Sequence, residues 1–67
     1  MTIPETIRAA RERAGMTQLE VGQALGYKGN AAQVYVATWE AGTRPVPKAK
    51  IKALAELLKI EVTALLP

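Results

Sequence analysis

The segment YKGNAAQVYVATWEAGTRP, residues 27–45, decides the fold class, because its side chains and its ends point to different structures. The residues in its middle that favour β-strands are Val34, Tyr35, Val36, Thr38 and Trp39. A strand here would need a partner, and no other segment alternates β-type residues. Asn30 as N-cap, Gln33 three residues later and Gly42 after the last turn instead predict a helix over about 30–41.

The other segments carry helix punctuation as well. Thr2 with Glu5 and Thr17 with Glu20 have the spacing of capping boxes, which predicts helices over about 3–14 and from Thr17 to Gly26. Helical spacing of apolar residues predicts two more, over about 46–58 and 62–66. We therefore expect an all-α fold, a compact bundle of four to five short helices forming one domain over 1–67.

Two details of these helices carry expectations about packing. Gly22 lies inside the second helix, where glycine costs about 1 kcal/mol relative to alanine, so we expect it to pack closely against a neighbouring element. In the helix over about 46–58, Lys48, Lys50 and Lys52 are expected to face solvent or a ligand, away from the apolar stripe.

Composition excludes several classes of function. The chain of 67 residues contains no Cys, His, Asp or Ser, so a thiolate or imidazole metal site and an imidazole-activated nucleophile are ruled out. We expect no enzyme activity and no cofactor. The absence of cysteine fits a reducing compartment, and no apolar stretch resembles a signal peptide or a membrane span. The expected location is the cytoplasm of a bacterial or phage-infected cell.

Positive charge is concentrated in the second half of the chain. The net charge is +3, and the segment from Lys28 to Lys52 contains five basic residues and one acid, Glu40. This distribution is compatible with an ordinary solvated surface, and equally with a basic stripe that faces a polyanion.

The predicted helix over 30–41 has an unusual outer face. If Val36 and Trp39 face the core, the outward or boundary residues are Gln33, Val34, Tyr35, Ala37 and Thr38, none of them charged. Glutamine can bond an adenine edge, threonine can bond a base or touch a thymine methyl, and alanine or valine can pack on that methyl. The face suits a DNA major groove; alternatively, Val34 and Tyr35 pack against the preceding loop or a second subunit.

The spacing of individual residues also resembles a known family. The pattern Arg11-x5-Thr17-Gln18-x2-Val21-Gly22-x2-Leu25-Gly26, followed by Trp39-Glu40-x-Gly42 and Arg44-x-x-Pro47, resembles the lambda repressor/Cro-like helix-turn-helix domains of the XRE family. The resemblance extends from about Ile7 to Leu66. It implies a helix-turn-helix fold in which the helix over about 30–41 reads the major groove of an operator.

The resemblance implies roles for particular residues. The base-reading positions it indicates are Gln33, Val34, Ala37 and Thr38. The phosphate-contacting positions that we expect are Gln18, Lys28, Asn30, Tyr35 and Arg44. Arg11 and Glu40 match a family pair that forms a semi-buried salt bridge between the first and third helices.

Two departures from the family pattern affect these assignments. The family usually has alanine where Gly22 stands, which we interpret as a minor change in packing. The stretch from Gly26 to Trp39 is about four residues longer than usual, so either the turn is longer or the reading helix gains a turn at its front. Residues near Trp39 are therefore better placed than Gln33, and Tyr27, Lys28 and Asn30 are further candidates for DNA contact.

The sequence thus predicts a small Cro/repressor-type regulator that binds double-stranded DNA as a homodimer. Val62, Leu65, Leu66 or the loop 44–46 are candidate dimer surfaces. Two rival hypotheses are an antitoxin that also binds a toxin protein and a helical protein-interaction adaptor. The chain ending at Pro67 is also compatible with the DNA-binding part of a longer repressor.

Overall fold

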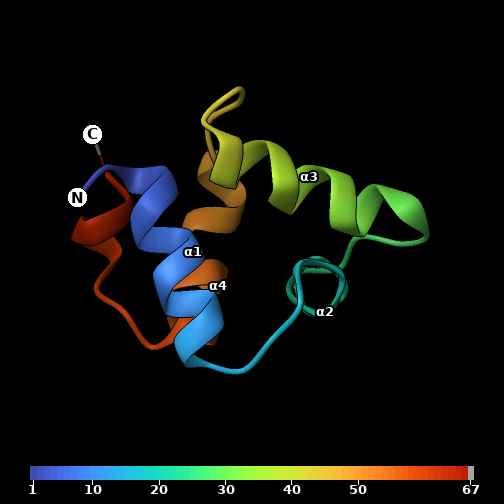
Figure 1. The fold of residues 1–67 in the computed structure, drawn as a ribbon, viewed down its shortest axis with the longest axis horizontal. Coiled ribbons are helices and arrows are strands. Elements are labelled where there is room, and N and C mark those ends of the chain that lie inside the picture. The colour runs from blue at the N-terminus through green and yellow to red at the C-terminus, as the bar shows by residue number, and fades with distance from the viewer. Residues whose placement is uncertain (67) are drawn as a thin grey trace.

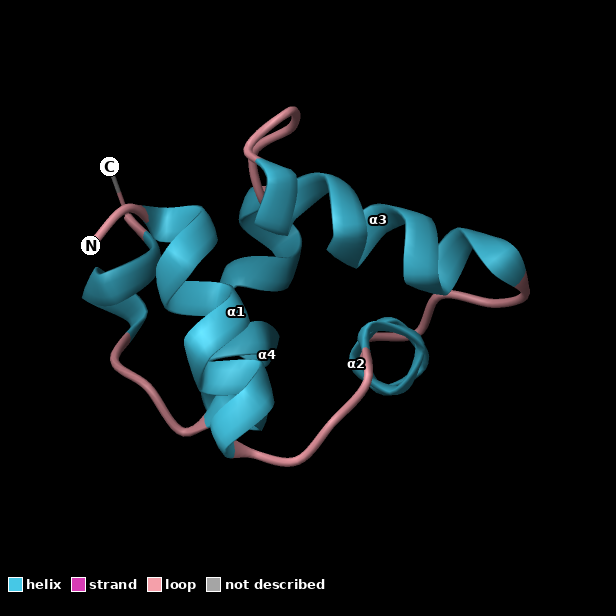
Figure 2. Ribbon diagram, viewed as in Figure 1, coloured by secondary structure: helices cyan, strands magenta, loops and turns pink. Residues whose placement is uncertain are grey.

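The computed structural model describes residues 1–66, and within this range the chain forms helices and no strand (Figure 1). Figure 2 shows that short turns join the helices, with α3 crossing above α2. The elements are α1 (Ile3–Arg13), α2 (Gln18–Ala24), α3 (Asn30–Ala41), α4 (Lys48–Leu58) and a terminal 3-10 helix, η1 (Val62–Leu65). The prediction of an all-α fold is confirmed. Pro67, the last residue of the predicted domain, lies outside the described residues.

The first two helices begin and end as their local sequences predict. In both capping boxes the threonine hydroxyl accepts the amide of the glutamate three residues later, and the glutamate accepts the threonine amide. Each helix then ends in a left-handed glycine, Gly15 after α1 and Gly26 after α2. Behind Gly26, the Tyr27 amide bonds the Gly22 carbonyl at 3.1 Å, which closes the last turn and directs the chain toward α3.

The span of α3 matches the predicted residues 30–41, but its N-cap differs from the prediction. The N-cap is Gly29, not Asn30, and no side chain caps this end, so the expected N-x-x-Q box with Gln33 is absent. Gly29 adopts φ 62° and ψ −150°, a conformation that is open essentially only to glycine. Asn30 is the first helical residue, and the connection to α2 is limited to residues 25–29.

The predicted bounds of the last two helices need small corrections. The helix predicted from about residue 46 begins at Lys48, because Pro47 is its N-cap with an extended ψ of 140°. The last helix is a single 3-10 turn that ends at Leu65, one residue earlier than predicted. No helix within residues 1–66 is both long and apolar enough to cross a membrane.

Every helix contributes to one hydrophobic core. Ala32, Val36 and Trp39 of α3 are buried, which confirms the predicted inward face of this helix. The other buried residues of the core cluster are Ile7, Ala10, Val21, Leu25, Leu54, Ala55, Leu58 and Leu65. In Figure 1, α1 and α4 lie together on one side, and α2 lies against the N-terminal half of α3 on the other. This packing leaves the opposite face of α3 open.

Gly22 marks the closest approach of α2 and α3. A Cβ atom on Gly22 would lie 2.1 Å from the carbonyl oxygen of Ala32 and 2.7 Å from its Cα atom. The predicted close packing is therefore present, and it is against backbone. Our interpretation of alanine as a minor change at this position was wrong, since backbone atoms cannot move aside as a flexible side chain can.

Candidate nucleic-acid interface

Glu40 is the polar centre that links the first three helices. It accepts Arg11 Nε at 2.6 Å and Nη2 at 3.1 Å, so Arg11 and Glu40 form the two-pronged salt bridge between α1 and α3. The side chains are 14% and 5% exposed. The hydrogen bond to Glu40 raises the pKa of the Arg11 guanidinium above its usual value, and burial opposes this shift. The charge of the only acid on α3 is thus neutralised inside the protein.

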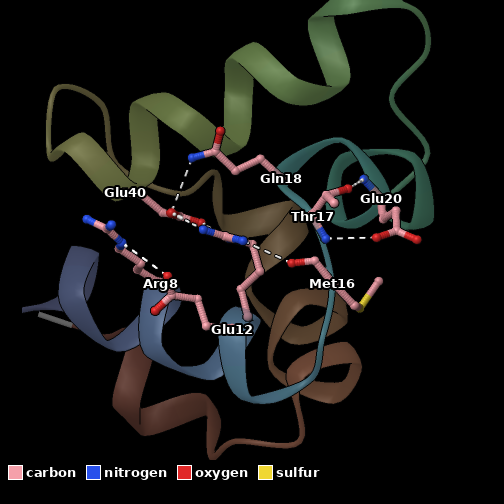
Figure 3. Close-up of polar contacts among 8 residues, drawn as sticks. Arg8, Glu12, Met16, Thr17, Gln18, Glu20 and Glu40 are labelled. Carbon is pink, nitrogen blue, oxygen red and sulfur yellow. Dashed lines mark hydrogen bonds and ion pairs between the residues drawn. The ribbon is translucent and has the colours of Figure 1, made fainter.

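Gln18 attaches the start of α2 to the same carboxylate. Its Nε2 donates to Glu40 Oε1 at 3.2 Å, as the labelled side chains in Figure 3 show. Arg11 Nη1 also donates to the carbonyl of Met16 at 2.9 Å, immediately before α2. An amide nitrogen carries two hydrogens, so Gln18 retains one donor and its carbonyl oxygen for an external group. The orientation of α3 relative to α1 and α2 is fixed by this network.

Tyr27 attaches the turn between α2 and α3 to the core. Its ring stacks on Tyr35 with 4.4 Å between centroids and lies 6.1 Å from the Trp39 ring. Burial, with a smaller contribution from Tyr35, raises the pKa of the Tyr27 hydroxyl above its usual value. Tyr27 is thus a packing residue. The alternative in which Val34 and Tyr35 pack against the preceding loop holds for Tyr35, which is half-buried against Tyr27. It does not hold for Val34, which is exposed.

Lys50 departs from its expected position in solvent or at a ligand. Its Nζ donates to the Leu25 carbonyl at 2.8 Å and lies 5.0 Å from the Tyr27 ring centroid, a cation–π distance. Lys50, on α4, therefore provides a hydrogen bond to a carbonyl at the C-terminal end of α2. Of the three lysines predicted to face outward, Lys48 and Lys52 do so.

The outward side of α3 presents small, uncharged groups. Gln33 and Val34 are exposed, with Val34 at 56%, and Ala37 and Thr38 are half-buried. Thr38 Oγ1 donates its hydrogen to the Tyr35 carbonyl at 2.6 Å. Toward an external partner, Thr38 therefore presents a methyl group and an acceptor oxygen. These groups can meet a thymine methyl and a base amino group, respectively.

Arg44 extends this side of α3 from the loop that follows it. A hollow of about 300 Å³ lies between the loop and the helix. Its lining residues are Asn30, Ala31, Val34, Tyr35, Thr38 and Arg44. The hollow brings together two predicted readers and three predicted phosphate-contacting residues; Gln33 and Ala37 lie outside it.

Ala31 was missed by the sequence analysis, although it lies three residues before Val34 and seven before Thr38. This helical spacing is a signal that could have identified it. The predicted contact residue Lys28 is exposed in the turn before α3, at the other end of the helix from Arg44. Basic side chains therefore lie at both ends of an uncharged helix face, an arrangement that suits the grooved, anionic surface of duplex DNA.

Comparison with known proteins gives one match. A protein-family model described as a helix-turn-helix domain matches residues 5–66, which is most of the chain. No curated protein and no solved structure matches the chain.

Proposed function

The chain belongs to the helix-turn-helix domain family, a DNA-binding family, and from this premise we propose that it is a sequence-specific transcriptional regulator of the Cro/repressor type. It acts as a binding protein, not as an enzyme, on the DNA of a bacterial or phage-infected cell. The reading element is α3, placed in the major groove with α2 across its entrance.

The observation that carries this proposal is the uncharged outer face of α3. Val34, Ala37 and Thr38 offer methyl groups and one acceptor oxygen, and Gln33 offers an amide that can bond an adenine edge in two places. A helix that faces only solvent would carry charged side chains there. The salt bridge of Glu40 removes its negative charge from a surface that meets phosphates.

Phosphate contacts surround this reading face. Lys28 and Arg44 supply cations at its two ends, and Asn30, Tyr35 and Gln18 supply hydrogen-bonding groups. Contacts of this kind fix the register of the protein on the duplex but carry no sequence information. One copy of a module this small makes too few contacts for tight specific binding, so the proposal includes a homodimer on a near-palindromic operator.

Selection of bound duplexes from a random library, at two salt concentrations, tests the proposal. The expected product is an inverted repeat with half-sites about 10 base pairs apart, and binding that weakens steeply with salt. Enrichment of no sequence at either salt concentration would refute it. Tight binding of a protein ligand with little salt dependence would favour the adaptor hypothesis instead.

A matched pair of variants tests the role of α3. Gln33→Ala should relax the preference at one base pair of each half-site at a cost of about 1–3 kcal/mol. Gln23→Ala removes the same side chain from an exposed position on α2 and should leave the preference unchanged. The assignment of Gln33 as a reader would be withdrawn if the two variants selected the same sequences as the unmodified protein.

A further inference from the structure

A second, larger concavity lies away from the reading face. It has a volume of about 910 Å³ and forms where the start of α1, the loop 42–47, the start of α4 and η1 meet. Figure 1 shows the start of α1 and η1 at the end of the molecule opposite the N-terminus of α3. The buried residues Ile7, Trp39 and Leu65 line the cavity, together with the more exposed Val62 and Leu66. We refer to it as the apolar groove.

Within the described part of the chain, the charged residues that line the apolar groove are all positive. They are Arg44 in the loop and Lys48 and Lys52 on the first turns of α4, and no carboxylate of residues 1–66 lies among the lining groups. An apolar interior with cations on one side matches an apolar molecule that ends in a negative charge. Cavities of about 300–1,000 Å³ are the usual size of small-molecule sites, so the groove is large enough for such a ligand.

A second copy of the chain fits the groove poorly. In a symmetric dimer built groove to groove, the same surface patch meets itself. The three cations of each copy, Arg44, Lys48 and Lys52, would then be enclosed in one interface with no acidic lining residue within residues 1–66 to pair with them, which is unfavourable.

We propose that the apolar groove is a binding site for a small amphipathic carboxylate, a molecule with an aliphatic or aromatic body and one carboxylate group. The body packs on Ile7, Trp39 and Leu65, and the carboxylate pairs with the cations of the loop and α4. No covalent step is involved. Ligand binding in the groove can be measured without DNA, so the site itself does not rest on the proposed function, although Arg44 and the candidate dimer residues Val62, Leu65 and Leu66 also line it.

Arg44 connects this site to the reading face. It lines both the apolar groove and the hollow beside Val34 and Thr38, so one basic residue borders two surfaces. A carboxylate in the groove competes with DNA for this cation. Ligand and DNA therefore weaken each other's binding by the same factor, as linkage requires. This regulatory step, unlike the site itself, rests on the proposed function.

Trp39 provides the test, because it is the only tryptophan of the chain and lines the groove. Its fluorescence is measured while decanoate is added to the full chain, and decanol serves as the uncharged match. A saturable change with decanoate, at an affinity about tenfold above that of decanol, is expected from one charge-assisted contact. The absence of saturable binding, or equal affinity for decanol, would overturn the proposal.

Surface variants locate the carboxylate without affecting the core. Lys48→Gln and Lys52→Gln should each weaken decanoate binding several-fold, whereas Lys59→Gln, beyond the end of α4, should not. Equal effects of all three variants would point to general charge attraction and refute the site. Sedimentation equilibrium in the presence of decanoate tests the alternative occupant. If the protein remains a dimer and the fluorescence of Trp39 does not change, the groove is assigned to a second copy and the proposal is overturned.

The effect of decanoate on DNA binding is measured in a separate experiment. Decanoate should raise the apparent dissociation constant for a selected operator in the unmodified protein and not in the Lys48→Gln/Lys52→Gln double variant. If no operator is selected, the proposed function fails while the fluorescence titration still decides the groove. If decanoate binds and the operator affinity is unchanged, the competition for Arg44 is refuted.

Discussion

Glu40 accepts hydrogen bonds from three side-chain nitrogens, two of Arg11 and one of Gln18, and its own side chain is almost completely buried. Burying both charges gives little net stabilisation by itself, because desolvation opposes the attraction. Removing one partner is different, since it leaves the other charge buried and unpaired. The pair thus determines how α3 is oriented more than how stable the protein is.

The variant Glu40→Gln tests this asymmetry. It keeps the shape of the side chain but strands the Arg11 guanidinium, and we expect the free energy of unfolding to fall by about 3 kcal/mol. The control is Glu12→Gln, which breaks the exposed Arg8–Glu12 pair, with side chains 67% and 58% exposed, and should cost less than about 0.5 kcal/mol. Urea denaturation of both variants measures the difference. Equal losses would contradict a special role for Glu40.

Gly22 is a second position where the type of a single residue matters, because it sets how closely α2 and α3 can pack. Alanine has the better helix propensity by about 1 kcal/mol, but its Cβ would collide with the Ala32 backbone. We expect Gly22→Ala to destabilise the protein by about 1–3 kcal/mol in spite of the propensity gain. Gln23→Ala, the exposed neighbour on α2, should change stability by less than about 0.5 kcal/mol. A stabilised Gly22→Ala protein would mean that α3 can move away from α2.

At the scale of the helices, the two capping boxes make stability depend on pH. The backbone amides of Thr2 and Thr17 donate to Glu5 and Glu20, and these bonds are the main reason that the pKa of both carboxyls lies below its usual value in the folded state. The threonine side chains lower the pKa further. A lowered folded-state pKa stabilises the protein above the unfolded-state pKa. This stabilisation is lost as the pH falls through the folded-state pKa.

The variant Glu5→Gln/Glu20→Gln removes this titration and keeps a capping residue that can still accept the amides. In urea denaturation between about pH 2 and 7, its free energy of unfolding should fall less on acidification than that of the unmodified protein. Glu61→Gln is the control, because the Glu61 side chain makes no capping bond at η1. Parallel curves for the double variant and the unmodified protein would contradict the role of the capping boxes.

The helix starts also show what the sequence can predict. The capping boxes of α1 and α2 were predicted correctly because each involves residues three apart, so all their atoms are local in sequence. The span of α3, predicted as about 30–41, is confirmed, but its N-cap was misplaced by one residue because Asn30 is a good N-cap by type, whereas the backbone of Gly29 makes the turn. Side-chain preference alone does not report that geometry.

Tertiary contacts set the limit for the candidate site. The inward face of α3 follows from the spacing of Ala32, Val36 and Trp39, and this spacing also orients the opposite face. The Lys50 bond to the Leu25 carbonyl spans 25 residues and has no local signal. The position of Arg44 beside Val34 depends in the same way on how the loop 42–47 folds back.

At the scale of the whole molecule, Arg44 borders two separate hollows. One lies beside the uncharged outer face of α3, and the other is the apolar groove. If its guanidinium contacts a phosphate, each such contact releases condensed counterions when DNA binds. The dependence of affinity on salt concentration therefore counts these contacts across the entire interface.

We expect Arg44→Gln to reduce the slope of log affinity against log salt concentration by about 1 per subunit and to weaken all sequences alike. Lys59→Gln is the matched control, because α4 ends on the side of the molecule away from α3 (Figure 1), and its slope should not change. Operator titrations at several salt concentrations measure both. An unchanged slope with relaxed preference at one base pair would instead place the Arg44 guanidinium on a guanine edge, where its position beside Val34 and Thr38 would make it a reader.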